Sequence, residues 1–319
     1  MQKEVLSGLN LDNGEPIYTQ EYIQSLRDTD KKHPDKLKII AQRGGQEDML
    51  SIDADIKICG GSRGGSKSFS SLMEVLKDIK NPDFHATILR NEKDDLQSLV
   101  TDSYKLFSQF GTYNKSQNDM TWNFDNGGWL KFSYYAGAYQ DFKTRFQGRQ
   151  YAYVCIDEGT QCPYKKFKYL LTNNRNAAHI RNRFWITCNP DPESWVRKFI
   201  DWWVTDEGYI DPERNGVIRY CFMDGDTPDS IYWGDTREEV YEQCKGIIDS
   251  LWKDSYEELG YTKLEMFINR RHLSVPTYQR TSSLSLPMFH ISPTLHSRMK
   301  NSVCETWRLT GTGKLLEMT

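Results

Sequence analysis

Residues 60–68, with the sequence GGSRGGSKS, have the pattern of a loop that binds phosphate. Glycines let backbone N–H groups curl around an anion, and the positive end of a following helix adds to the attraction. An apolar, strand-like run precedes the segment and a helical pattern follows it, which is the context such a loop requires. In this pattern Lys67 contacts the β- and γ-phosphates of ATP, and the Ser68 hydroxyl binds Mg²⁺. We therefore predict ATP and Mg²⁺ as cofactors, with a plain glycine-rich turn as the alternative, and expect the nucleotide to be bound by Gly61, Ser62, Gly64, Gly65, Ser66, Lys67 and Ser68.

One position departs from the usual pattern GxxxxGK[ST]. Ser66 stands where a glycine ordinarily precedes the lysine. A serine fits this place if its backbone φ is negative, because a positive φ is comfortable only for glycine. Replacement of the glycine by Ser66 therefore puts the affinity for the nucleotide at risk.

A second motif is the apolar strand Tyr151–Asp157, which ends in the pair Asp157 and Glu158. In phosphoryl transfer, one carboxylate holds Mg²⁺ and another orients and deprotonates the attacking water. Asp157 is the candidate for the first role and Glu158 for the second. A strand that ends in two acids is common by itself, but its place about 90 residues after Lys67, beyond intervening strands, makes the pair more specific.

A third motif is the strand Phe184–Thr187, which continues into Cys188, Asn189 and Pro190. A hydroxyl or an amide at the end of a neighbouring strand is suited to sensing the γ-phosphate. Thr187 and Asn189 are therefore candidate coupling residues. The alternative is a strand followed by a turn, since Asn-Pro commonly begins one.

Short apolar runs alternate with longer helical patterns through the centre of the chain, which is typical of an α/β fold with a mostly parallel sheet flanked by helices. Asp125–Gly128 predicts a hairpin turn between Trp122–Phe124 and Trp129–Phe132. The expected strands are Asp55–Cys59, His85–Arg90, Trp129–Tyr134, Tyr151–Asp157 and Arg183–Cys188, and the expected helices are Lys67–Ile79 and Asp94–Phe110.

The composition divides the chain into four parts. We expect an N-terminal arm over 1–50, an ATPase core over 51–199, a small helical lid over 200–267 and an atypical, poorly ordered tail over 268–319. The seven cysteines form no CxxC pair, which favours buried thiols over a metal site. No run approaches the roughly 18 apolar residues of a membrane helix, so we expect no membrane contact.

The three motifs in this order resemble the large terminase subunits of tailed bacteriophages, P-loop NTPases of the ASCE type. The resemblance covers about residues 40–235. Arg43–Glu47 is similar to the segment whose glutamine contacts adenine in that family, which implies this role for Gln46. Gly148-Arg149, before the acidic strand, and Asn189–Pro192 with Ser194-Trp195, after the third, add to the match.

The resemblance implies an ATP-driven motor that moves double-stranded DNA into a procapsid. It implies a homo-oligomeric ring on the portal protein, a small terminase subunit as partner, and action in the host cytoplasm. An arginine completes each ATP site in this family. Arg63, within the loop, is the candidate in cis, and Arg145 and Arg149 are the candidates in trans.

The net charge of −3 shows no overall basic bias, so DNA contacts must come from a local patch. Residues 159–189 contain no acidic residue, and their cations are interleaved with aromatic residues. A DNA-gripping surface and an ordinary solvated or subunit-facing surface are equally compatible with that pattern. The cations are Lys165, Lys166, Lys168, Arg175, Arg181 and Arg183.

The pattern departs from the family after residue 235. Large terminases usually carry a nuclease domain, and the remaining 84 residues show no strands that end in spaced aspartates, so we expect no nuclease activity from this chain. The tail from Ile268 breaks from the family pattern, which leaves a native sequence and a shifted reading frame both open. Two other functions also remain open, a helicase-like P-loop motor and a truncated, non-catalytic docking protein.

Overall fold

The computed structural model describes residues 6–7, 38–39, 41, 45–52, 54–61, 66–114, 116, 119–176, 180–189, 191–258, 262–268 and 273–274. Most of the predicted N-terminal arm and most of the tail lie outside these residues. So do four members of the predicted phosphate loop, Ser62, Arg63, Gly64 and Gly65.

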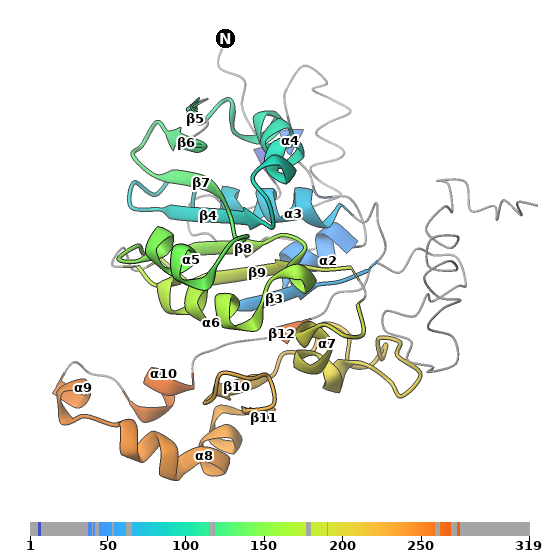
Figure 1. Cartoon of the computed structure of the whole chain (residues 1–319), viewed down its shortest axis with the longest axis vertical. Coiled ribbons are helices and arrows are strands. Elements are labelled where there is room, and N and C mark those ends of the chain that lie inside the picture. The colour runs from blue at the N-terminus through green and yellow to red at the C-terminus, as the bar shows by residue number, and fades with distance from the viewer. Residues whose placement is uncertain are drawn as a thin grey trace, which may run out of the picture.

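The core is an eight-stranded sheet, mostly parallel as predicted (Figure 1). Only its last two strands, β6 and β5, run antiparallel to their neighbours. The strand that ends in Thr187 lies between the phosphate-loop strand and the acidic strand, which is the ASCE arrangement. In spatial order the strands are β12 (Leu273–Ser274), β3 (Ile56–Cys59), β9 (Arg183–Thr187), β8 (Tyr153–Ile156), β4 (His85–Arg90), β7 (Trp129–Tyr134), β6 (Thr121–Phe124) and β5 (Gly111–Asn114).

The central strands are apolar at successive positions because helices cover both faces of the sheet. Every residue of β3, β8 and β9 is buried. The parallel strands bring the carboxyl ends of β3, β8 and β9 to one edge, where all three predicted motifs lie. The predicted hairpin between β6 and β7 is confirmed, with Gly127 at φ 106° in its turn.

Two groups of helices pack on the two faces of the sheet and bury separate apolar clusters. Figure 1 shows α5 and α6 in front of β8 and β9. The predicted helix from Lys67 ends in a 3-10 turn at Lys77, and the one from Asp94 opens with such a turn. One face carries α2 (Gly45–Ser51), α3 (Lys67–Glu74) and α4 (Gln97–Phe107), and the other carries α5 (Tyr139–Phe146), α6 (Tyr164–Asn173) and α7 (Trp195–Phe199).

The segment predicted as a helical lid also contains a β-hairpin, formed by β10 (Tyr220–Met223) and β11 (Ile231–Gly234). The hairpin packs on α8 (Arg237–Leu251), with α9 (Asp254–Glu258) and α10 (Lys263–Phe267) beyond it, below the core in Figure 1. The sequence missed the hairpin because its strands are only four residues long. No helix in the described part of the chain is long and apolar enough to cross a membrane.

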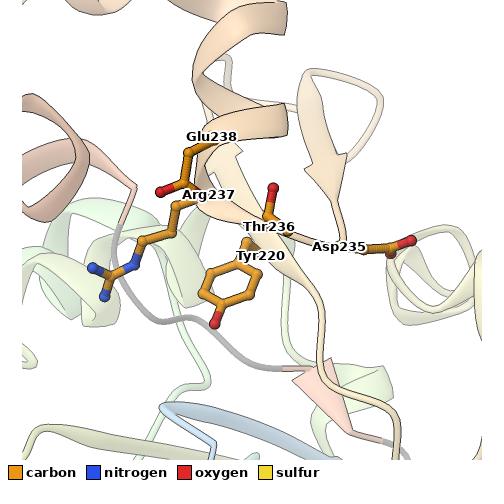
Figure 2. A pocket seen from close by; sticks show the side chains of 5 residues that line it. All are labelled: Tyr220, Asp235, Thr236, Arg237 and Glu238. Atoms are coloured by element: carbon orange, nitrogen blue, oxygen red, sulfur yellow. The ribbon is translucent and has the colours of Figure 1, made fainter.

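The start of α8 is fixed by a capping interaction. The Thr236 hydroxyl accepts a hydrogen bond from Glu239 N, and the Glu239 carboxylate accepts one from Asp235 N. Beside this cap lies a cavity of about 290 Å³, lined by Tyr220, Asp235, Thr236, Arg237 and Glu238 (Figure 2). None of the predicted site residues lines it.

Apolar packing continues across residue 200, where the core was predicted to end. Trp203 is buried in the same cluster as Phe167 of α6, and its indole N–H donates to Val217 O at 3.0 Å. Trp202 lies partly exposed against the guanidinium groups of Arg214 and Arg219. Trp233 of β11 packs on the same cluster, 5.6 Å from the Trp203 ring, so the packing continues from the core into the lid, and the boundary at residue 200 stays a prediction.

One strand falls in the tail, where the sequence predicted no regular structure. β12 pairs in parallel with β3, with Leu273 opposite Ile56 and Ser274 opposite Lys57. A two-residue strand leaves no periodic pattern to detect. The chain thus returns to the core after the lid and adds a strand on the far side of the phosphate-loop strand.

A cluster of charges is buried beneath the phosphate loop. Glu74 of α3 is fully buried and lies 2.9 Å from Lys77 Nζ, 3.4 Å from Lys57 Nζ and 3.0 Å from Arg183 Nε. Arg183 Nε is in ion-pair contact with Glu74 without the alignment of a hydrogen bond, and Arg183 also pairs with Asp78.

The same lysines attach α2 to this cluster. Lys57 Nζ donates to Met49 O, and Lys77 Nζ donates to Leu50 O. Burial alone would raise the pKa of Glu74, but the three surrounding cations hold it below its ordinary value. Glu74 is therefore the anion on which the helix carrying Lys67 and the helix carrying Gln46 both depend.

We predict that Glu74→Gln lowers the free energy of unfolding by about 3–5 kcal/mol, because it leaves buried cations without their anion. The stabilisation from Glu74 is present above its unfolded-state pKa and is lost as the pH falls through its lower folded-state pKa. Urea unfolding at neutral pH measures the change. Asp102→Asn, at the exposed pair with Lys105, is the matched control and should cost less than about 1 kcal/mol. Equal losses in the two variants would contradict the role of Glu74.

Candidate nucleotide site

The structure brings five of the predicted site residues together at the carboxyl edge of the sheet. Lys67 and Ser68 open α3, Asp157 and Glu158 follow β8, and Thr187 ends β9. Ser68 Oγ donates to Asp157 Oδ1 at 2.8 Å, although 89 positions separate them. The sheet order explains this contact, because only β9 lies between β3, which leads into the phosphate loop, and β8, which leads into Asp157.

Asp157 is the centre of the network and is fully buried. Its Oδ1 accepts from Thr187 Oγ1 at 2.5 Å as well as from Ser68, and its Oδ2 accepts from Arg90 Nε at 2.6 Å. The sequence did not single out Arg90, which ends β4. The available signal was a cation at the end of an otherwise apolar strand that neighbours the acidic strand.

Lys67 lies against the end of β9. Its Nζ donates to Gly61 O at 3.0 Å and to Asn189 Oδ1 at 3.4 Å, so Asn189 joins the group. Burial lowers the pKa of Lys67, and the surrounding acidic groups only partly oppose the shift. A desolvated ammonium gains more from a phosphate than a hydrated one does.

Two residues at the site have left-handed backbones that are unusual for side chains with a Cβ. Ser66 has φ 53° and ψ 21°, and Glu158 has φ 61° and ψ 46°. Ser66 thus lacks the negative φ at which a serine fits this position, because the turn into α3 needs the conformation that glycine supplies in the usual motif. Among the described residues no others with a Cβ have positive φ. Such strain gathers at functional sites, where the surrounding structure holds it.

The contacts of Glu158 show how the strained backbone is held. Glu158 N donates to Thr187 Oγ1 at 3.0 Å, and Glu158 O accepts from the Tyr135 hydroxyl at 3.1 Å. Its carboxylate is partly exposed and accepts from Gln161 Nε2 at 3.3 Å. A Cβ at the next residue, Gly159, would lie 2.3 Å from the Ile186 side chain, so the turn must pass close to β9. Thr187 thus fixes Asp157 and Glu158 at once.

The donor set suits Mg²⁺. A hydroxyl and a carboxylate oxygen meet at Ser68 and Asp157, and Mg²⁺ in nucleotide sites takes few protein ligands beside water and phosphate. No group of three or more His, Cys, Asp or Glu side chains in the described ranges is arranged to hold a metal ion. The adenine-contacting role predicted for Gln46, now found buried on α2, stays a prediction.

Arg145 and Arg149 lie away from this network, at the end of α5. They line a cavity of about 250 Å³ with Lys93 and Lys131, and no carboxylate is among the described residues that line it. The Arg145 guanidinium stacks 3.7 Å above the Tyr134 ring and donates to Tyr134 O. Arg149 is exposed and its Nε donates to Arg145 O. The two arginines therefore belong to a positive pocket that Tyr134, at the end of β7, also lines.

Most cations of the basic stretch at residues 159–189, a candidate DNA-contact surface, bind other groups of the protein. Only Lys165 and Arg175 of the six cations are exposed. The other four bind groups of the chain itself, which favours the alternative of an ordinary protein surface for them, and a DNA contact at this stretch stays a prediction. Lys166 donates to Tyr135 O and Gly137 O, Lys168 to Gly225 O, Arg181 to Asp55, and Arg183 to Asp78.

A family model described as the N-terminal part of the T4-like-virus type of terminase large subunit matches residues 58–271. This match covers more than half of the chain and includes both acidic residues and the start of α3. The chain belongs to the terminase large subunit family. Among curated proteins, no match was found.

Solved structures of terminases show distant similarity. A large terminase from a thermophilic bacteriophage is 18% identical over 50% of this chain and 43% of that one, with a TM-score of 0.40. The large terminase ATPase domain of Thermus phage P74-26 is 12% identical over 60% of this chain and 76% of that one, with a TM-score of 0.42. The Phi-28 gp11 DNA packaging motor is 16% identical over 51% and 56%, with a TM-score of 0.34. The terminase chain described here thus spans less than half the length of the first of these three proteins.

We predict that Ser66→Gly raises the free energy of unfolding by up to about 1 kcal/mol. The left-handed region costs a residue with a Cβ roughly 1–2 kcal/mol, which the glycine variant recovers. The greater freedom of glycine in the unfolded chain offsets about 0.4–1 kcal/mol of that gain. Ser66 makes no side-chain cap to α3 that the glycine would lose. Denaturant unfolding measures the change, and Ser66→Ala, which keeps the Cβ, should show no gain. A glycine variant that is less stable than the alanine variant would contradict backbone strain at Ser66.

Proposed function

We propose that this chain is the ATP-hydrolysing motor subunit of a phage terminase, and that hydrolysis drives double-stranded DNA into a procapsid. The observation that supports the proposal is a hydrogen-bond network around the buried Asp157. Ser68 and Thr187 donate to the Asp157 carboxylate, and the Glu158 backbone N–H donates to Thr187. Membership of the terminase family supports the same function. A docking protein without catalysis would have no use for Glu158, whose carboxylate projects from a strained backbone that two hydrogen bonds hold in place.

Phosphoryl transfer requires neutralisation of charge, a positioned nucleophile and exclusion of bulk water. Lys67 and the start of α3 supply positive charge to the phosphates. Ser68 and Asp157 would hold Mg²⁺, which neutralises further charge on the phosphates when it is bound. The remaining side chains fix the geometry, so little reorganisation is needed when ATP reacts.

Glu158 is the proposed general base, which would orient a water against the γ-phosphate, and the partial exposure of its carboxylate supports this role. Its backbone N–H is bound to Thr187, so a shift of β9 moves the base. Asn189, beside Lys67, is placed to respond to the γ-phosphate that Lys67 contacts. Thr187 and Asn189 thereby couple the phosphate to the strand that lies between the two motifs.

The partners follow from the proposed role. The chain would assemble as a ring on the portal protein, in the host cytoplasm, with a small terminase subunit to recruit DNA. Arg149, exposed beside the positive pocket, is suited to reach the nucleotide of a neighbouring subunit. Lys165 and Arg175 are the exposed members of the basic stretch that remain available to DNA phosphates.

Two substitutions test the enzyme. Glu158→Gln should keep ATP binding but lower kcat by roughly 10²–10⁴-fold, because the amide cannot accept the proton of water. Lys67→Ala should lose ATP binding itself. Phosphate release and binding of a fluorescent ATP analogue, with and without double-stranded DNA at high protein concentration, separate the two effects.

Gln161→Ala is a fitting control, because Gln161 touches the Glu158 carboxylate from the exposed side and its loss should change kcat only slightly. Turnover by Glu158→Gln close to that of the wild type would remove Glu158 from the role of base. Wild-type protein that binds ATP but never hydrolyses it would favour a docking function instead.

Mixing of inactive variants tests an arginine in trans. If Arg149 acts on a neighbour's nucleotide, Arg149→Ala and Glu158→Gln should each be nearly inactive, yet a mixture should regain activity. In mixed rings an intact site on the first variant meets an intact arginine from the second. Hydrolysis is measured against the mixing ratio at constant total protein.

The matched comparison is Arg63→Ala mixed with Glu158→Gln. An arginine that acts in cis leaves every site in the mixture incomplete, so that mixture should stay inactive. If hydrolysis recovers in the mixture with Arg63→Ala and not in the mixture with Arg149→Ala, then Arg63 acts in trans and Arg149 does not.

A further inference from the structure

Arg90 joins the buried acid of the nucleotide site to the beginning of α4. We propose that it is a positioning residue that orients Asp157 and transmits the state of the site to α4. The inference rests on the proposed function, because it assumes that Asp157 holds Mg²⁺ with the nucleotide. Both ends of the link are hydrogen bonds of one guanidinium group.

The first end is at Asp157. The Arg90 Nε donates to Asp157 Oδ2 at 2.6 Å, and the Arg90 side chain is itself only 15% exposed. A fully buried carboxylate is costly to leave without a cation, and an arginine stays charged at any pH the fold tolerates. Arg90 therefore fixes the orientation in which Asp157 presents Oδ1 to Ser68.

The second end is at α4. The Nη1 of Arg90 donates to Asp95 O at 2.7 Å and to Ser98 Oγ at 3.0 Å. Asp95 in turn accepts a hydrogen bond from Glu92 N, which closes the turn between β4 and the helix. The guanidinium is planar and rigid, so its two ends cannot move independently. A rotation of Asp157 on binding of metal and nucleotide must shift or break the contacts at Asp95 and Ser98.

The route continues from α4 across the sheet. Leu99 and Val100 of α4 lie in the same buried cluster as Leu72 of α3, so α4 also packs against the phosphate-loop helix. Ser103 Oγ accepts from the Trp122 indole N–H at 2.8 Å, which ties α4 to β6. The edge of the sheet formed by β5 and β6 is therefore linked to the nucleotide site through described contacts. A response at that edge requires that the position of α4 depends on the nucleotide.

Three variants separate the two ends of the link. Arg90→Gln removes both, Arg90→Lys keeps a charge near Asp157 but cannot span to α4, and Ser98→Ala removes only a contact on the α4 side. Arg90→Gln should lower kcat about 10–100-fold, the usual cost of losing a partner that orients a metal ligand, with the KM for ATP little changed. Arg90→Lys should restore part of kcat, and Ser98→Ala should keep nearly all of it.

Amide hydrogen exchange over residues 94–107, with and without Mg²⁺-ADP or Mg²⁺-ATPγS, measures the response of α4. The wild type should show a nucleotide-dependent change that Arg90→Gln and Arg90→Lys lose and Ser98→Ala reduces. Lys105→Gln is the control on the exposed side of α4, where Lys105 pairs with Asp102, and it should behave as the wild type.

The outcomes distinguish the inference from the function beneath it. Wild-type protein that binds Mg²⁺-nucleotide without any change in α4 overturns the link to α4 and leaves the ATPase proposal standing. Unchanged kcat in Arg90→Gln, with its fold verified by circular dichroism, overturns the positioning role. If Arg90→Gln does not fold, Arg90→Lys and Ser98→Ala decide, and an α4 response equal to that of the wild type in both overturns the proposal. Wild-type protein that binds no nucleotide would overturn both the proposed ATPase function and the proposed role of Arg90.

Discussion

A carboxylate removed from water must be surrounded by donors, and this constraint organises the site around Asp157. Its two oxygens take hydrogen bonds from the ends of three different elements, α3, β4 and β9. Each donor sits on a strand or helix of the core instead of a free loop. The order of the central strands follows from the same need, since β9 and β4 must lie on either side of β8 to reach its final acid. The geometry is thus prepared by folding before any nucleotide arrives.

Strain and compensation occur together at this site. Ser66 and Glu158 have backbones that a side chain with a Cβ ordinarily avoids. Glu158 is held by hydrogen bonds from Tyr135 and to Thr187, and Ser66 precedes a helix anchored from below by the ions around Glu74. The buried ions explain how the start of α3 tolerates an unfavourable turn, because the other end of that helix is fixed. Stability in the base of the core supports local strain at its edge.

The sequence predicted the parts of the fold that have strong local patterns. β4 and β7 have the predicted bounds, since apolar runs with distinct ends define them, and the Asp-Asn-Gly-Gly turn identified its hairpin. Contacts between distant positions were harder. Arg90 meets Asp157 only because two strands are neighbours in the sheet. The backbone carbonyls that bind Lys166 and the carboxylates that bind Arg183 likewise come from distant segments. A stretch of cations therefore resembled an exposed surface until the fold showed its partners. The backbone of Ser66 is set by the turn into α3, which residue type alone does not reveal.

The return of the chain to the sheet at β12 makes the lid an insertion with two attachments to the core. Five Cα steps separate Ile268, in the lid, from Leu273, beside β3, so these two positions can never lie more than about 18 Å apart. The other attachment runs from Val204 to the first strand of the hairpin. Non-covalent contacts join the same two parts, because Lys168 of α6 donates to Gly225 O and the Trp233 ring of β11 packs edge-on against Phe199 and Trp203. Any movement of the lid relative to the core must therefore break these contacts as well as bend the two connections, one of which ends beside the strand that leads into the phosphate loop.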